Sequence, residues 1–497
     1  MLFVSLAPTL LGACANNDAD TQSNRTDVSV ELGEYCRSFP TSFFGDCVAD
    51  ADCAPSGSSC VRPDAEFIDG SRSPLTCESR QFPLNDGEYC EVNTDCDRGM
   101  CAVAGRCVAP CAGDRDCDDT QQCVDVWLKS TGDAMQSVHG CVNRYELPPG
   151  RSVTRGSANL DQLENDKTSI ELLGGIAFFV IQPECGFNTL PLSLKTLGEG
   201  STTLFNAYSV IDGDVPLSGV SLDYSPISLL IPNGPNAPIA SDGYRLTMQS
   251  YKNKAPLTAR YSAIELAQRG GILDIDLFYV GDFGARTTDG TLPTAVANAF
   301  DSMDAILSAA AIRIGDIRQH FVSGQVGASY SYLDIESHPA SLQELMTMSA
   351  GVRGASLSIF FVHELDFGGG LLGIAGGVPG TMGMPATSAS GIAIAYDSID
   401  EHELGAIMAH EASHFLGLFH TTEIGGQSQL NPLTDTYAPP DCLSLADDGR
   451  LIVSDTEVCR EALQNLMFPA AIPSVIASVP TLSEQQQWVI QRAPILR

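Results

Sequence analysis

Hydrophobic residues in the last part of the chain follow the pattern of an α/β domain. ILDIDLFYV (Ile272 to Val280), LSIFFVHEL (Leu357 to Leu365) and GIAIAYD (Gly391 to Asp397) are short apolar runs that predict buried strands. LPTAVANAFDSMDAILSAA (Leu292 to Ala310) has helical periodicity, with a proline near its first turn. A last long helix should begin near Glu403. Strands that alternate with helices predict an α/β (α+β) layer domain over residues 270–497.

A different pattern precedes this domain. Residues 149–269 contain short alternating or apolar runs broken by Gly, Pro and Asn, such as GGIAFFVIQP, VSLDYSPISLLIP and GYRLTMQSY. Short strands with regular turn signals predict a β-sandwich. This stretch contains no catalytic constellation, so we assign it no chemistry.

Residues 33–148 are rich in cysteine and poor in long apolar runs. Thirteen of the 17 cysteines lie between Cys36 and Cys141, and the tetrapeptide GEYC occurs twice, ending at Cys36 and at Cys90. Such a segment needs disulfides because it cannot bury a sufficient core. A zinc site is disfavoured because no Cys-x-x-Cys pair occurs here. The spacing leaves the connectivity open, and the odd count suggests one partner outside, with Cys185 nearest.

The first 13 residues form an apolar run that fits a secretory signal and is too short to span a bilayer. Leu11-Gly12-Ala13-Cys14 resembles the lipobox of bacterial lipoproteins. That resemblance implies cleavage before Cys14 and lipid on its thiol, with residues 14–32 as a linker. No Lys or Arg precedes the run, so the true start could lie upstream. The alternative is a soluble chain with an incidental apolar start.

Composition limits the classes of function. Hydrophobic residues make up 44% of the chain and charged residues 18%, so ordinary cores can form. The formal charge of −34 would repel phosphates, which excludes nucleic acid as a favoured partner. Setting Cys14 aside leaves an even number of cysteines, as expected for pairing in an oxidising compartment. We therefore expect an exported protein.

Three of the eight histidines lie within AHEASHFLGLFH, residues 409–420. On a helix, His410 and His414 project from the same face, where one ion can meet both imidazoles. Glu411 can reach a water on that ion without being a ligand. Gly417 can take the left-handed conformation that ends a helix, which would bring His420 back to the ion. The spacing predicts a three-histidine metal site.

These five residues match H-E-x-x-H-x-x-G-x-x-H, so the chain resembles the metzincin zinc peptidases. The resemblance implies one catalytic Zn²⁺ held by His410, His414 and His420, with Glu411 as general base. It also implies a methionine in a tight turn beneath the metal, and Met467 in QNLMFPA fits that role. We expect Glu423 to be either an acceptor for a ligand imidazole or a solvated side chain.

The segment before Met467 looks like the pappalysin branch of the metzincins. Asp435, Cys442 and Cys459 stand ahead of the methionine, but Tyr437 replaces the proline usual in that branch, and Phe468 stands where astacins carry a metal-binding tyrosine. Cys442 and Cys459 flank the segment that leads to Met467 and are isolated from the other cysteines. We expect them to pair with each other.

In metzincins an edge strand of the sheet pairs with the extended substrate. GLLGIAGGVPG (Gly370 to Gly380) is the candidate for that strand because it is short, rich in glycine and just ahead of the last strand. A plain surface loop is the alternative. The four remaining histidines that we considered, at positions 139, 320, 338 and 402, are interpreted as ordinary core or surface residues.

The sequence therefore predicts an exported zinc endopeptidase, anchored by lipid at the bacterial outer membrane or cell surface, or otherwise secreted. Its substrate would be a protein or peptide, and the pattern leaves its oligomeric state open. The alternative function is a surface adhesion or ligand-binding lipoprotein with a minor or inactive peptidase domain. Intact Glu411 and His420 favour the enzyme.

Overall fold

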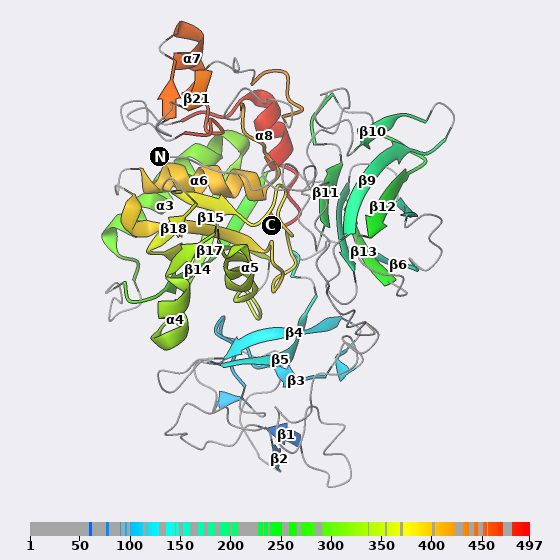
Figure 1. Ribbon diagram of the computed structural model, residues 1–497, viewed down its shortest axis with the longest axis vertical. Helices are drawn as coiled ribbons and strands as arrows, with labels where there is room; N and C mark the ends of the chain where they lie inside the picture. Colours follow the sequence, from blue (N-terminus) through cyan, green and yellow to red (C-terminus); the bar gives the residue numbers. More distant parts are fainter. Residues whose placement is uncertain are drawn as a thin grey trace, which may run out of the picture.

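A computed structural model covers the 497 residues of the chain. It describes residues 59–61, 76–78, 90, 95–96, 100–112, 116–118, 120–128, 136–144, 146–148, 153–159, 167–172, 177–183, 189–198, 201–206, 227–231, 233–236, 239–250, 258–265, 270–283, 291–335, 337–352, 355–367, 371–399, 403–422, 431–436, 442–445, 451–454, 456–470 and 480–497. Figure 1 shows small strands between residues 59 and 143, a group of β-sheets between residues 153 and 265, and a mixed α/β domain from residue 271 onwards.

The α/β domain is built on a five-stranded sheet in the order β15-β14-β17-β20-β19. The strands are β14 (Gly271–Val280), β15 (Ile312–Val322), β17 (Ser356–Val362), β19 (Gly373–Ala375) and β20 (Gly391–Ala395). The first four strands in this order run parallel, and β19 pairs antiparallel with β20 at the edge. The expected edge strand within residues 370–380 is confirmed.

Helices cover both faces of this sheet (Figure 1). One face carries α3 (Thr294–Leu307), which continues into the 3₁₀ turn η7 (Ser308–Ala310), and α6 (Leu404–Phe415). The other face carries α4 (Gly324–Tyr330) and α5 (Pro339–Thr347). Because β14, β17 and β20 bury side chains on both faces, their sequences read as nearly continuous apolar runs.

Short elements complete the domain. The remaining ones are β16 (Tyr332–Asp334), β18 (Glu364–Asp366), η8 (Tyr396–Ser398), β21 (Leu443–Leu445), β22 (Leu451–Val453), α7 (Glu457–Ala462) and α8 (Glu484–Ile490). The helix α8 begins with a capping box formed by Ser483 and Gln486. The first turn of this helix is hydrogen-bonded, through Gln486, to Asn465 in the segment that contains Met467.

The sheet buries one carboxylate in a charged network. Asp276 on β14 is 0% exposed, and it accepts hydrogen bonds from the guanidinium of Arg318 at 2.8 and 3.0 Å. The imidazole of His320 lies 2.7 Å away, and the Ser356 hydroxyl also donates to the carboxylate. Burial alone would raise the pKa of Asp276, but the bonds from His320 and Arg318 outweigh it and hold that pKa below its usual value.

Two expectations for the α/β domain need correction. The strand expected over residues 357–365 ends at Val362, because the N–H groups of His363 and Glu364 both donate to the Ser331 carbonyl. That contact lets β18 pair with β16 instead of continuing β17. The sequence analysis also missed β15, in which polar residues interrupt the apolar pattern.

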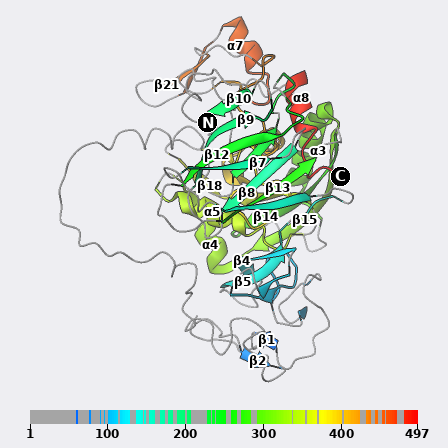
Figure 2. The ribbon, with the colours of Figure 1, turned by 90° about the vertical axis from the view of Figure 1, so that its right-hand side faces the viewer.

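Eight strands between residues 153 and 265 form two four-stranded antiparallel sheets, ordered β10-β9-β12-β7 and β11-β8-β13-β6. Figure 2 presents them towards the viewer. The strands are β6 (Val153–Asn159), β7 (Lys167–Leu172), β8 (Ala177–Pro183), β9 (Thr189–Thr196), β10 (Thr203–Asn206), β11 (Ile227–Ile231), β12 (Tyr244–Ser250) and β13 (Thr258–Glu265). Phe178 and Leu230 join the core of the α/β domain, so the two parts share apolar packing.

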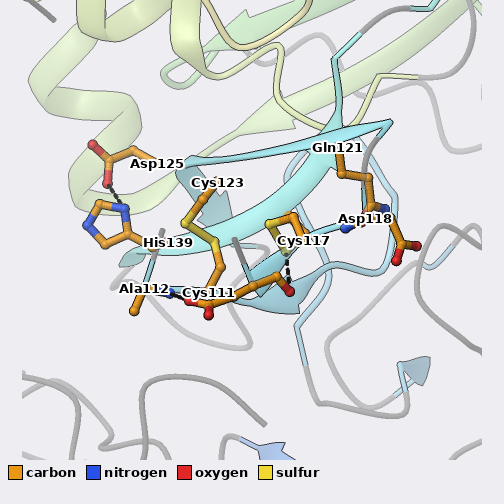
Figure 3. Close-up of a disulfide and its surroundings, with 10 residues drawn as sticks. Cys111, Ala112, Cys117, Asp118, Gln121, Cys123, Asp125 and His139 are labelled. Carbon is orange, nitrogen blue, oxygen red and sulfur yellow. Dashed lines mark hydrogen bonds and ion pairs between the residues drawn. A yellow bond between two sulfur atoms is a disulfide. The ribbon is translucent and has the colours of Figure 1, made fainter. Parts of the chain in front are cut away.

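The cysteine-rich region contains β1 (Ser59–Val61), β2 (Thr76–Glu78), β3 (Ala109–Pro110), β4 (Gln121–Leu128) and β5 (Gln136–Asn143). Its described disulfides are Cys90–Cys101, Cys96–Cys107, Cys111–Cys123 and Cys117–Cys141. Figure 3 shows Cys111 bonded to Cys123 beside β4 and β5. These cysteines are disulfide-bonded, which agrees with the interpretation of a stapled region and disfavours a zinc site there. Among the described residues, no helix is both long and apolar enough to cross a membrane.

Candidate metal centre and catalytic glutamate

The helix α6 is buried along its whole length and carries the first two histidines. It ends in a Schellman motif: the N–H of Gly417 donates to the His414 carbonyl, and the N–H of Leu418 donates to the Ser413 carbonyl, both at 2.9 Å. Gly417 has a φ of 113°, which an L side chain rarely adopts. The turn that the sequence predicted at Gly417 is therefore present, and it returns the chain towards the helix.

This turn brings three imidazoles together. The Nε2 atom of His420 lies 3.2 Å from Nε2 of His410 and 3.0 Å from Nε2 of His414. All three side chains are buried. Two nitrogens at about 2.0–2.1 Å from one tetrahedral ion would lie roughly 3.3–3.4 Å apart. The three histidines can therefore bind one metal ion.

Backbone carbonyls fix the orientation of two of these rings. Nδ1 of His410 lies 2.6 Å from the Leu466 carbonyl oxygen, and Nδ1 of His414 lies 2.6 Å from that of Leu418. A carbonyl can only accept, so each Nδ1 carries the proton and donates it. Each Nε2 then turns a lone pair towards the centre of the cluster. This is the arrangement that a metal ion needs from a ligand histidine.

Burial also favours the neutral form of these ligands. It lowers the pKa of His410 and His414 well below the usual value, and the neighbouring His420 lowers both further. A metal ion binds the neutral imidazole, so no proton has to be displaced at neutral pH. The electrostatics and the tautomers therefore both fit a cation at this position.

Glu411 lies beside the cluster and is 1% exposed. Its Oε1 atom has no hydrogen-bond partner in the described part of the chain. Burial raises the pKa of Glu411 well above its usual value, and only the backbone N–H of Ala375 acts against this shift. A buried carboxylate with an unpaired oxygen is costly, so its presence next to three clustered imidazole nitrogens indicates a place for a cation and water.

The edge strand β19 abuts this glutamate. A Cβ atom added to Gly373 would lie 2.6 Å from Cγ and 2.8 Å from Oε1 of Glu411, so only glycine fits at this position without displacing the carboxylate. Ala375, two residues further on, donates its N–H to the same side chain. The sequence analysis assigned this strand to substrate binding and missed its contact with Glu411, because spacing along the chain does not reveal contacts between distant segments.

Met467 lies in a tight turn that is bonded to the histidine site. It is 0% exposed, its N–H donates to the Asn465 side chain, and its carbonyl accepts from the N–H of Thr421, directly after His420. The residue before it, Leu466, holds His410. The amides of Asn465 and Gln486 bond each other in both directions, which fixes the turn to α8. The sequence-predicted methionine thus lies in the segment that supports the metal ligands.

Other predicted residues lie around this turn or outside the description. Cys442 and Cys459 form a disulfide, as the sequence analysis expected, and they pack with Phe468. Asp435 accepts hydrogen bonds from Ser483 and Gln485 at the start of α8, so it orders that helix. The predictions for Cys14, Cys185, His402, Glu423 and Tyr437 fall on residues that lie outside the described ranges.

Of the histidines interpreted as ordinary residues, the three that the structure describes lie away from the cluster. His320 is paired with buried Asp276, His139 lies 3.5 Å from Asp125 (Figure 3), and His338 is 77% exposed. The sequence analysis left His363 unassigned. In the structure its Nδ1 lies 2.6 Å from Asp397, at the end of β17.

Comparisons with known proteins give limited information. No family model matches the chain, and no curated protein matches it. Among solved structures, the chain is similar to metalloproteinase-II from Bacteroides fragilis at 12% identity and a TM-score of 0.27, over 68% of this chain and 90% of that one. A family two carbohydrate esterase from Cellvibrio japonicus matches at 8% identity and a TM-score of 0.11, over 44% and 82%. At these scores the similarities carry no argument about function.

Proposed function

We propose that this protein is a zinc-dependent endopeptidase of the metzincin type that cleaves extracellular or surface proteins. One observation carries the proposal: three buried imidazoles bring their Nε2 atoms together, with the His410 and His414 lone pairs directed into the cluster, beside a buried glutamate with an unpaired oxygen. A purely structural histidine cluster would not need an adjacent carboxylate without a partner. The disulfides support an exported protein.

The donor set favours zinc. Three nitrogen ligands with a fourth position open is the usual arrangement of a catalytic zinc site, and imidazole suits this borderline ion. When bound, zinc would polarise the scissile carbonyl and lower the pKa of a water to about 7. His410, His414 and His420 would hold the ion, and the carbonyls of Leu466 and Leu418 would keep the rings of His410 and His414 in place.

Glu411 is assigned the proton transfers. Its carboxylate would accept the proton of the attacking water and then give it to the leaving amine nitrogen. The contact with Ala375 orients the carboxylate, and burial excludes bulk water that would compete for the proton. A cation at the histidine cluster would favour the ionised form that this role requires.

The edge strand β19 is assigned substrate binding. Gly376 N–H and the Leu372 carbonyl bond to β20, so the backbone groups of Gly373 and the carbonyl of Ala375 point to the other side, where the Ala375 N–H already bonds Glu411. An extended peptide could pair along that side, antiparallel to β19, and its scissile bond would then pass Glu411.

The deciding experiment compares two variants with a control. Glu411→Ala should keep about one zinc per chain, because the three ligands are intact, but should lower peptide cleavage by about 10²-fold to 10⁴-fold. His414→Ala should lose both zinc and activity. Glu461→Ala, at an exposed position on α7, should match the wild type. If the wild type binds zinc yet cleaves nothing in a broad peptide library, the surface-binding alternative takes its place.

Membrane anchoring is a separate part of the proposal and rests on the sequence before Cys14 alone. Cys14→Ala should release the protein from the membrane fraction, because stable retention needs the several acyl chains that a lipoprotein carries. A variant that stays fully membrane-bound would rule out the anchor without affecting the peptidase assignment.

A further inference from the structure

A cavity of about 610 Å³ lies outside the three-histidine site, where three parallel strands end. Its walls include Gly281–Phe283 after β14, Ser323 and Gly324 after β15, and His363 after β17. The residues of the metal centre are not among those that line it. The cavity is therefore a second candidate site on the same domain.

Its position coincides with a reversal in the chain topology. The connection from β14 to β15 passes through α3 on one face of the sheet, and the connection from β15 to β17 passes through α4 and α5 on the other face. The loops that leave β14 and β15 therefore diverge. In open α/β sheets, ligands bind in the crevice that forms at the carboxyl ends of strands at such a point.

Five of the eleven residues that line the cavity carry aromatic rings. The ring of His363 is stacked on Phe283 with 4.3 Å between centroids, and on Tyr332 with 5.2 Å. Tyr279 is stacked on Phe321 with 5.1 Å between centroids. Tyr332 is 62% exposed, so the outer ring of the first stack is open to solvent. Two ordered stacks with an exposed ring favour a flat partner that extends the stacking.

The charged residues around the cavity limit which compounds can bind in it. Among the described residues that line the cavity, none is lysine or arginine, whereas Asp282 is one of them. His363 is bonded to the carboxylate of Asp397, which supplies further negative charge close by. With a formal charge of −34 over the whole chain, an anionic compound would be repelled.

A buried hydroxyl group supplies an independent sign of a ligand. Tyr279 is 2% exposed, and its Oη atom makes no hydrogen bond within the described part of the chain. Burial also raises the pKa of Tyr279, so this hydroxyl keeps its proton at all ordinary pH values. An unpaired buried hydroxyl in the wall of a cavity is costly unless a water or a ligand completes it.

We propose that this cavity binds a flat aromatic compound without negative charge, which stacks against the Tyr332 and Phe283 group of rings and completes the hydrogen bonding of Tyr279. The site would work independently of the metal centre, since the two share no residue. Such a compound could be a free small molecule or an aromatic side chain of a peptide, because both offer the same ring.

Titration of the full chain with two indoles of opposite charge tests whether the cavity binds an aromatic ring and whether it rejects negative charge. Tryptamine carries a positive charge and indole-3-acetate a negative one on the same ring system. By calorimetry or ligand-observed NMR, tryptamine should bind, and indole-3-acetate should bind about tenfold more weakly or not at all. Chelation of the metal should leave tryptamine binding unchanged. The absence of tryptamine binding at concentrations up to about 1 mM would overturn the proposal.

Two variants locate the binding. Tyr332→Ala removes the exposed ring and should weaken tryptamine binding about tenfold. Ala328→Leu, at an exposed position on α4 that lines the cavity, should block it by filling the space. Ile239→Ala is the control, since this residue is 51% exposed on another part of the molecule. Unchanged affinity in both cavity variants would place the indole elsewhere and refute the assignment.

The same assay separates the two sources of the ring. N-acetyltryptophan amide presents the indole as it occurs inside a peptide. If it binds at least as tightly as tryptamine, the site receives a peptide side chain. If only tryptamine binds, the site receives a free aromatic amine. Tighter binding of an uncharged disaccharide than of either indole would overturn the aromatic assignment.

Discussion

Replacement of Gly373 by alanine tests whether the edge strand positions Glu411 for its proposed proton transfers. The added Cβ would lie 2.6 Å from Cγ of Glu411, whereas carbon atoms in contact lie about 3.5 Å apart or more. The Cγ atom lies in the middle of the side chain, so a rotation of the carboxylate alone does not relieve this contact. We therefore expect Glu411 to move by about 1 Å. The φ of Gly373 lies outside the range that alanine avoids, so the backbone itself tolerates the change.

A displacement of this size has a calculable effect on the reaction. A misplacement of about 1 Å can cost about 10²-fold in rate, which corresponds to roughly 2.7 kcal/mol in the activation free energy. The loss should appear in kcat more than in KM, because the proton transfers occur only in the transition state. Zinc content should stay near one per chain, since the three atoms that the added Cβ would meet first all belong to Glu411 and none to a histidine.

The assay is hydrolysis of a quenched fluorescent peptide, together with metal analysis of the same samples. Gly234→Ala is the matched control, because its Cβ would meet only the end of the Leu433 side chain, at 3.2 Å. If Gly373→Ala retains kcat within about twofold of the wild type, the strand does not position the glutamate. Loss of zinc in this variant would also contradict the reasoning, since the effect would then arise at the ligands.

Three further predictions concern stability. Zinc added back to chelated protein at about 100 times its Kd should raise the free energy of unfolding by about 2.7 kcal/mol. A melting temperature that does not change when zinc is added would contradict a metal site. The double variant Cys442→Ser, Cys459→Ser should lose roughly 3 kcal/mol in chemical denaturation, because the disulfide closes a loop of 17 residues, and a change below about 0.5 kcal/mol would contradict this. Because the pKa of Asp276 is lowered in the folded state, its contribution to stability is present above the unfolded value of about 3.9 and lost as the pH falls below it. Asp276→Asn should therefore flatten the fall of stability as the pH drops below about 3.9, and an unchanged profile would assign that fall to other carboxylates.

The metal ligands could be found from the sequence because local geometry brings most of them together. His410 and His414 are one helical turn apart, and the left-handed conformation of a single glycine brings His420 back to them. The spacing in the sequence is therefore enough to predict the three-histidine cluster. The same holds for the apolar strands β14 and β20, which lie in the sheet as predicted. These features depend on residues that are close in the chain.

Features that depend on distant segments could not be predicted in this way. The strand β15 was missed because its polar side chains are satisfied by partners elsewhere: Arg318 binds Asp276 on β14, and Arg313 binds Asp304 on α3. The carbonyl of Leu466 that orients His410 lies 56 residues away from it. The aromatic cavity is likewise assembled from the ends of three separate strands, none of which carries a motif.

The contact between Gly417 and Leu230 links the metal site to the neighbouring sheet. A Cβ on Gly417 would lie 3.0 Å from Cδ2 of Leu230, on β11, so the turn that delivers His420 is packed against a part of the chain almost 190 residues earlier. A bulkier residue at either position would push the third ligand away from the other two. Under the proposed function, substitutions where that sheet packs on the turn would alter the metal site, and we expect the two parts to be inherited, exchanged or lost as one unit.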